Sequence, residues 1–171
     1  MKKLLLFIGL FFAIALSSFA QKYALVDMEY ILENIPSYEI ANQELEKTGK
    51  LWQEEVENMQ KDVQNMYKSF QTNVASLSAN EKTKRENAIV AKESELQELR
   101  NKYFGAEGEM FKRRQSLIEP IQDSVYNAIK EIALTYGYQA IIDRASATSM
   151  IFASPDIDIS NDVLAKLGYS K

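Results

Sequence analysis

Cysteine and histidine are both missing from this 171-residue chain. Without them there is no disulfide framework, no thiol or imidazole catalyst and no zinc site built from the usual ligands. Glycine and proline are scarce, at six and three residues, which argues against glycine-rich phosphate-binding loops. These absences indicate a protein that is not an enzyme and that needs no cofactor and no metal.

The first twenty residues have the three parts of a secretory signal peptide. Lys2 and Lys3 precede an apolar run over residues 4–16, and Ser-Phe-Ala follows at 18–20. The run is shorter than the roughly 20 apolar residues of a membrane span. We therefore expect export and cleavage after Ala20. The mature chain would keep 18 basic and 24 acidic side chains, a net charge of −6, which makes it a poor binder of nucleic acid.

A long helix is predicted from residue 38 to residue 77. Its apolar positions are spaced by four and three residues in near-perfect alternation, which is the heptad pattern of a coiled-coil seam. At 1.5 Å per residue this helix would be a rod of roughly 60 Å. Gly49 interrupts the pattern and either divides the helix or lies within it. The seam positions are Ala41, Leu45, Thr48, Trp52, Val56, Met59, Val63, Met66, Phe70, Val74 and Leu77.

A second long helix is expected to fold back on the first. Ser78 and Glu81 fit a capping box, so the turn of the hairpin lies near residues 78–81. The apolar pattern then continues to Tyr136, where Gly137 can take the left-handed closing conformation. Two long helices joined by so short a turn pack antiparallel. Gly105, Gly108 and Pro120 lie inside this second helix, where they either permit close packing or act as hinges.

The remaining segments favour short strands around the hairpin. Residues 22–27, 138–143 and 149–153 are rich in β-branched and aromatic side chains, and Ser160 is the expected N-cap of a final short helix. Three such strands make a marginal sheet with bare edges, which favours association with other copies. The predicted fold is therefore α+β and mainly α, a long antiparallel helical hairpin on a small β-sheet body that oligomerises.

The predicted organisation has four parts. Residues 1–20 are the signal peptide, and residues 21–37 hold the first strand and the start of the body. Residues 38–116 form the hairpin arm, and residues 117–171 hold the helix root, two strands and the final helix. Contacts between copies are expected through the sheet and the helix root, at Ile121, Val125, Ile132, Ile141 and Ile151.

Carboxylates and cations offer few signs of chemistry. Asp27 and Asp143 each end a strand and could form an acid/base pair, but such residues commonly accept hydrogen bonds from nearby backbone N–H groups. Asp156 and Asp158 are expected in a turn, because the further ligands of a calcium loop do not follow. Basic runs at 82–85 and 112–114 are either solvated faces or surfaces for anionic partners.

Adjacent apolar pairs are the most informative oddity of the arm. Neighbours on a helix point about 100° apart, so a narrow seam cannot bury both members of a pair. The surplus either widens the core or forms an apolar wall that grips another protein. The pairs are Leu51-Trp52, Met66-Tyr67, Ile89-Val90 and Tyr103-Phe104.

Several stretches together resemble the Skp/OmpH family of periplasmic chaperones. They read Tyr-Ala-Leu-Val-Asp at 23–27, Tyr-Ile-Leu at 30–32, Phe-Gly with Glu-Gly at 104–108, Leu-Ile-Glu-Pro-Ile at 117–121, and the strand at 138–143. The resemblance implies an ATP-independent periplasmic holdase, a homotrimer whose arms enclose unfolded outer-membrane proteins. This mature chain is acidic, unlike the best-known members, so contact with a membrane surface is left open.

On this hypothesis the candidate client-binding residues are Tyr67, Phe70, Tyr103 and Phe104, with Gly105, Gly108 and Pro120 as hinges. A purely structural envelope coiled coil is the alternative, although it would not need strands at both ends of the hairpin. An adaptor that docks a transporter through its hairpin tip would need a barrel-like domain, for which too few residues remain.

Overall fold

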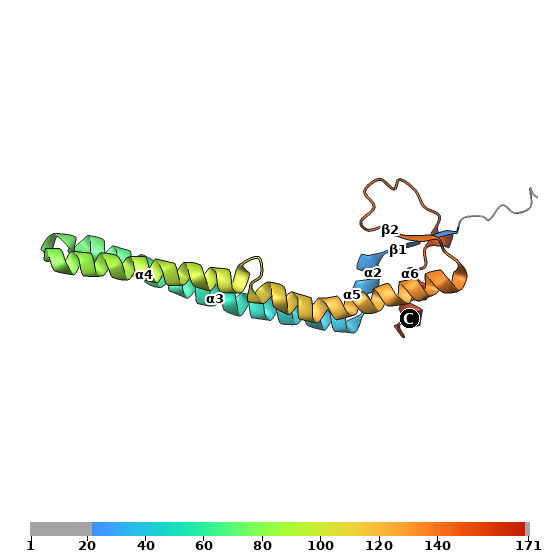
Figure 1. The fold of residues 1–171 in the computed structure, drawn as a ribbon, viewed down its shortest axis with the longest axis horizontal. Coiled ribbons are helices and arrows are strands. Elements are labelled where there is room, and N and C mark those ends of the chain that lie inside the picture. Colours follow the sequence, from blue (N-terminus) through green and yellow to red (C-terminus); the bar gives the residue numbers. More distant parts are fainter. Residues whose placement is uncertain (1–21, 170–171) are drawn as a thin grey trace, which may run out of the picture. The chain divides into compact units, whose positions relative to one another are not determined.

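The computed structural model describes residues 22–169, so the predicted signal peptide lies outside the described residues. The chain forms two compact units. The body comprises residues 22–34 and 125–169, and the arm comprises residues 35–124. Figure 1 shows the elements in chain order, and the predicted α+β, mainly helical fold is confirmed. They are β1 (Tyr23–Val26), α2 (Met28–Glu33), α3 (Pro36–Asn73), η1 (Val74–Ser76), α4 (Ala79–Phe104), α5 (Glu109–Tyr136), β2 (Ala140–Asp143), η2 (Pro155–Ile157) and α6 (Ser160–Lys166).

The arm is an antiparallel hairpin of α3 and α4, continued by the first part of α5 (Figure 1). Three hydrogen bonds join the two helices with opposed numbering: Glu55 with Tyr103, Gln60 with Arg100, and Tyr67 with Glu93. The predicted seam is confirmed, because every one of its α3 positions is buried or half-buried while the intervening positions are mostly exposed. The arm is thus held by one repeated packing pattern.

The tip of the arm is closed as the sequence predicts. The Ser78 hydroxyl accepts a hydrogen bond from the Glu81 backbone N–H, and the Glu81 carboxylate accepts one from the Ser78 N–H. This capping box satisfies two orphan donors at the start of α4. These contacts lower the pKa of Glu81 below its usual value, chiefly through the hydrogen bonds from Ser78, with a smaller electrostatic contribution from Arg85.

The two long helices differ from their predicted extents at glycine. Helix α3 runs unbroken through Gly49, which lies opposite the methyl group of Met110. The single helix predicted from the tip to Tyr136 is wrong, because α4 ends at Phe104 and α5 begins at Glu109. Gly105 and Gly108 make the turn between them. Two glycines within four residues lower helix stability enough for the chain to leave the helix there.

The body contains a parallel two-stranded sheet. Tyr23 pairs with Ala140 and Val26 with Asp143, and the arm lies in the crossover connection between the strands. The third strand predicted at 149–153 is wrong, because these residues form no strand. The free edge of β1 is taken by a bridge between Leu25 and Asp158. Apolar residues at 149–153 therefore have no strand edge of β1 to pair with in a single chain.

Helix ends in the body follow local rules. Gly137 has φ +71°, and the Tyr138 N–H donates to the Ala133 carbonyl, which is the predicted left-handed closure of α5. Gly168 ends the last helix in the same way, with φ +85°. The predicted N-cap is wrong, because Ile159 precedes the first turn of α6 and Ser160 bonds elsewhere. The short helix α2 was not predicted from the sequence.

Candidate functional site

Apolar side chains outside the seam form the candidate functional surface of the arm. Each adjacent apolar pair is split as expected, with one member in or beside the seam and the other exposed. Val90, for example, is 63% exposed although Ile89 beside it is buried. Phe111 is also exposed and was missed by the sequence argument, although its place beside Met110 is the same kind of pair. The exposed members are Leu51, Tyr67, Val90, Phe104 and Phe111.

Tyr103 lies within the arm core rather than on its surface. Its ring stacks on Trp52, with centroids 4.8 Å apart and planes 4° apart, and only 7% of the residue is exposed. Its hydroxyl donates a 2.6 Å hydrogen bond to the Glu55 carboxylate. That bond, with burial as the next cause, raises the pKa of Tyr103 above its usual value. Phe104 packs edge-on against the same ring and remains 44% exposed.

Tyr67 and Phe70 occupy different environments on α3. Tyr67 is exposed, and its hydroxyl donates a 3.0 Å hydrogen bond to Glu93 on α4, which raises the pKa of the phenol. Phe70 belongs to the seam and is half-buried. Of the four predicted client-binding residues, Tyr67 and Phe104 therefore present rings to solvent.

Two of the predicted hinge residues, Gly105 and Gly108, lie in the turn between α4 and α5, whereas the third, Pro120, lies inside α5. A side-chain carbon at Gly105 would overlap the Asn101 carbonyl oxygen, and one at Gly108 would lie 2.9 Å from the Tyr103 carbonyl oxygen. The backbone is therefore too close for any other residue to fit unchanged. Pro120 lies inside α5, and the Ser124 hydroxyl donates to its carbonyl.

The predicted interface residues differ widely in exposure within a single chain. Val125 and Ile132 are buried, whereas Ile121 and Ile141 are half-buried. Ile151 is fully exposed and its neighbour Phe152 is 84% exposed. Ile151 and Phe152 are thus the most exposed large apolar residues of the body, followed by Leu134 at 76%.

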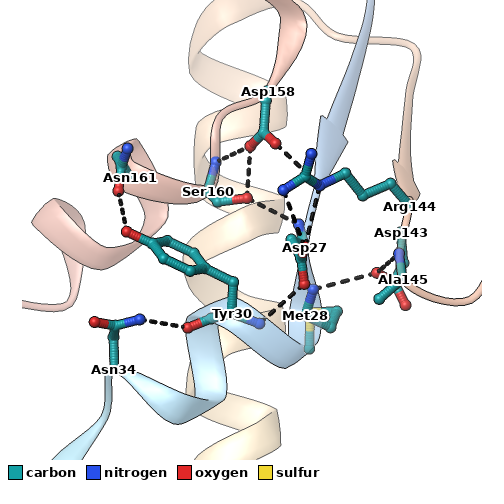
Figure 2. A network of polar contacts seen from close by, with 10 residues as sticks. All are labelled: Asp27, Met28, Tyr30, Asn34, Asp143, Arg144, Ala145, Asp158, Ser160 and Asn161. Carbon is teal, nitrogen blue, oxygen red and sulfur yellow. Dashed lines mark hydrogen bonds and ion pairs between the residues drawn. The ribbon is translucent and has the colours of Figure 1, made fainter. Parts of the chain in front are cut away.

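A polar network ties the chain segments of the body together (Figure 2). The Arg144 guanidinium lies 3.0 Å from the Asp27 carboxylate and 3.2 Å from that of Asp158. The Ser160 hydroxyl donates to Asp158 and accepts from the Asp27 N–H. The Ser160 hydroxyl therefore links the segment at 158–160 to Asp27, and Arg144 joins both of them from a third segment. Sequence reasoning missed this role of Ser160, because its partner Asp27 lies 133 positions away in the sequence.

Asp27 and Asp143 act as backbone acceptors, as their positions after strands suggest. Asp27 caps α2 by accepting from the Tyr30 N–H, and Asp143 accepts from the backbone of Met28 and Ala145. Burial alone would raise the pKa of Asp143, but the backbone and Ser146 hydrogen bonds outweigh it and lower the pKa. Asp143 is thus held as a charged acceptor. Asp156 and Asp158 lie in and just after the turn η2, as expected.

None of the helices within residues 22–169 is long and apolar enough to cross a membrane. In the same residues no group of three or more acidic side chains is placed to hold a metal ion.

Comparisons with known proteins bear on the whole described chain. A family model described as "Outer membrane protein (OmpH-like)" matches residues 22–167. The chaperone protein Skp of Yersinia enterocolitica is 29% identical over 162 residues, which cover 94% of this chain and 94% of that protein. The matched regions include both the body and the arm.

Proposed function

This chain belongs to the OmpH-like family, as its sequence resemblance indicated, and we propose that it is a periplasmic holdase chaperone for unfolded outer-membrane proteins. The observation that supports the proposal is the set of apolar side chains that remain exposed on the arm after its two helices have paired. Strands of an unfolded barrel are apolar at alternate residues. A broad, adaptable apolar wall suits such clients better than a shaped pocket.

The four proposed client-binding residues have different roles: three would contact the client, and one would hold a neighbouring aromatic ring in place. Tyr67 and Phe104 present their rings to solvent and would contact the client directly. Tyr103 is stacked on Trp52 and packs edge-on against Phe104, so it would hold that ring in place. Phe70, half-buried in the seam, would contribute the edge of its ring.

We also propose that the chain works as a homotrimer joined through the body. The described sheet has only two strands, and Ile151 and Phe152 are exposed beside no partner strand. Pairing of residues 149–153 with a sheet edge of another copy would satisfy their backbone groups and bury both side chains. Ile141 and Ile121 would join this contact, while Val125 and Ile132 would support it from the core. The three arms would then enclose the client.

The arm would adapt to client size at the turn between α4 and α5. Gly105 and Gly108 interrupt the helical hydrogen bonding there, whereas Pro120 lies within a continuous helix. We therefore place the proposed hinge at residues 105–108, with Pro120 as a second, smaller bend.

The proposal is tested by dilution of a urea-unfolded outer-membrane barrel into the mature protein, with and without ATP. We expect suppression of aggregation that is independent of ATP. A variant with Tyr67→Ser and Phe104→Ser should need several-fold more protein for equal protection, while Tyr169→Ser, an exposed tyrosine of the body, serves as the matched control. Light scattering checks that all variants keep the same oligomeric state.

Equal protection by the double variant and the control would remove Tyr67 and Phe104 from the client site. No protection by the unmodified protein would return the chain to the class of structural coiled coils. A monomer of the unmodified protein at micromolar concentration would overturn the trimer, and Ile151→Asp should produce that monomer if the interface is correct.

A further inference from the structure

A groove near the tip of the arm lies between the two helices of the hairpin. Its volume is about 400 Å³. Met66, Ala88 and Ile89 give it apolar walls, and the small side chains of Ala88 and Ser69 leave it open. Arg85 lines it one helical turn from Ile89, so a cationic residue and apolar residues line the same groove. Asn65 completes the lining.

The groove lies in the basic part of an acidic chain. Residues 64–90 carry four basic and two acidic side chains, whereas residues 36–63 carry three basic and seven acidic ones. In the second basic run, Lys112 and Arg113 are paired with Glu109 and Glu44. Among the described residues, Lys82, Lys84 and Arg85 form no ion pair within 4 Å, so their charges are available to a partner.

The spacing of charge and apolar surface matches an extended peptide. Residues one turn apart on a helix face have Cβ atoms about 5–6 Å apart. In an extended chain, side chains at positions i and i+2 lie on one face, roughly 6.6 Å apart. A peptide with an apolar residue at i and a carboxylate at i+2 can therefore place the first beside Ile89 and the second on Arg85.

We propose that this groove binds extended client segments in which an apolar residue is followed two positions later by Asp or Glu. The inference rests on the proposed chaperone function and names a sequence preference within it. Within the lipid-facing band of a barrel strand, alternate residues are all apolar. A carboxylate on the same face therefore occurs where the band ends, so the groove would select the ends of strands.

The test uses fluorescence anisotropy with labelled peptides and the mature protein. Three peptides of equal length share one apolar residue at i and carry Asp at i+2, Asn at i+2, or Asp at i+1. We expect the i+2 Asp peptide to bind about tenfold more tightly than the other two, because a charge-assisted bond to Arg85 forms only there. Arg85→Gln should abolish the difference. Lys84→Gln removes the same charge one residue away, outside the groove lining, and should keep it.

Equal effects of Arg85→Gln and Lys84→Gln, or equal binding of the three peptides, would overturn the proposal in favour of general charge attraction. Binding to vesicles with anionic lipid that is lost in Arg85→Gln, without peptide discrimination, would overturn it in favour of a lipid surface. The barrel aggregation assay keeps the two proposals apart. If the unmodified protein suppresses aggregation but does not discriminate among the peptides, only the proposed peptide preference of the groove is wrong. If the unmodified protein does not suppress aggregation, the proposed holdase function itself is wrong.

Discussion

The arm and the body are stabilised in different ways. The arm repeats one packing contact every three or four residues between helices that are joined by a short tip. The body depends on a two-stranded parallel sheet and on hydrogen bonds between residues 115 to 133 positions apart, such as Asp27 with Ser160. We therefore expect the loss of one contact to leave most of the arm intact, and the loss of one contact in the body to release a whole segment.

This difference predicts how far unfolding extends from a destabilising substitution in each unit. An exposed helical hairpin can open locally near its tip, because each turn contacts only its opposite neighbours. The body closes a loop that includes the entire arm, so its segments must all be ordered together. We therefore expect equal substitutions to cost more in the body than near the arm tip.

The largest effect is expected from removing buried isoleucine side chains. Ile31 is fully buried in α2 of the body, and Ile89 is 4% exposed in α4 of the arm. Ile31→Ala should destabilise the body by about 2–5 kcal/mol because it leaves a cavity. Ile89→Ala should cost less, since the groove beside it lets the helices adjust. Urea unfolding, with hydrogen exchange to assign the change to each unit, measures both.

An equal loss for both isoleucine variants would contradict the comparison. So would exchange that rises across the whole arm in Ile89→Ala, because that result would make the arm a single cooperative unit rather than a series of local contacts.

Loss of the Ser160 hydroxyl should give the next largest effect. Ser160→Ala leaves the Asp27 N–H without its acceptor and removes one donor from Asp158. Because the site is buried, the expected cost is about 1–3 kcal/mol. Ser124→Ala is the matched control in the arm, since that hydroxyl is exposed and bonds only to the Pro120 carbonyl of its own helix. If Ser160→Ala lowers the free energy of unfolding no more than the control does, the polar network does not hold the segments of the body together.

The arm was predictable because its rules are local. The heptad spacing identified the buried face of α3, and the Ser78 and Glu81 pair identified the start of α4. The split apolar pairs followed from the 100° turn between neighbours. The break at 105–108 was misjudged, because the cost of two glycines must be weighed against packing that the sequence alone does not give, and the exposure of Phe111 was missed.

The body was harder to predict because its partners are distant in sequence. The strands β1 and β2 were recognised from composition, but nothing local specified that Asp158 would bridge to Leu25 and leave residues 149–153 unpaired. Ser160 looked like an N-cap by its sequence context, yet its hydroxyl serves Asp27 from another segment. In the candidate site, the adjacent pair Tyr103-Phe104 predicted that only one ring would be buried, and Tyr103 is the buried one, stacked on Trp52 across the hairpin.

The smallest effects, of opposite sign, are expected at two glycines. Gly49 lies in the interior of α3 with helical geometry, and an added Cβ would lie 3.1 Å from the flexible end of Met110. Gly49→Ala should therefore stabilise the arm by about 0.5–1 kcal/mol, because alanine loses less backbone entropy in a helix. The increase should appear as a higher urea midpoint for the exchange of arm amides.

Gly137→Ala is the matched substitution in the body and should act in the opposite direction. The residue has φ +71° with no atom within 4 Å of an added Cβ, so backbone strain alone decides the result. Left-handed backbone costs an alanine about 1–2 kcal/mol, and the closure between the Tyr138 N–H and the Ala133 carbonyl should weaken.

Destabilisation by Gly49→Ala would mean that Met110 cannot move and that α3 and α5 are tightly packed there. Unchanged stability in Gly137→Ala would mean that the end of α5 can close without the left-handed residue.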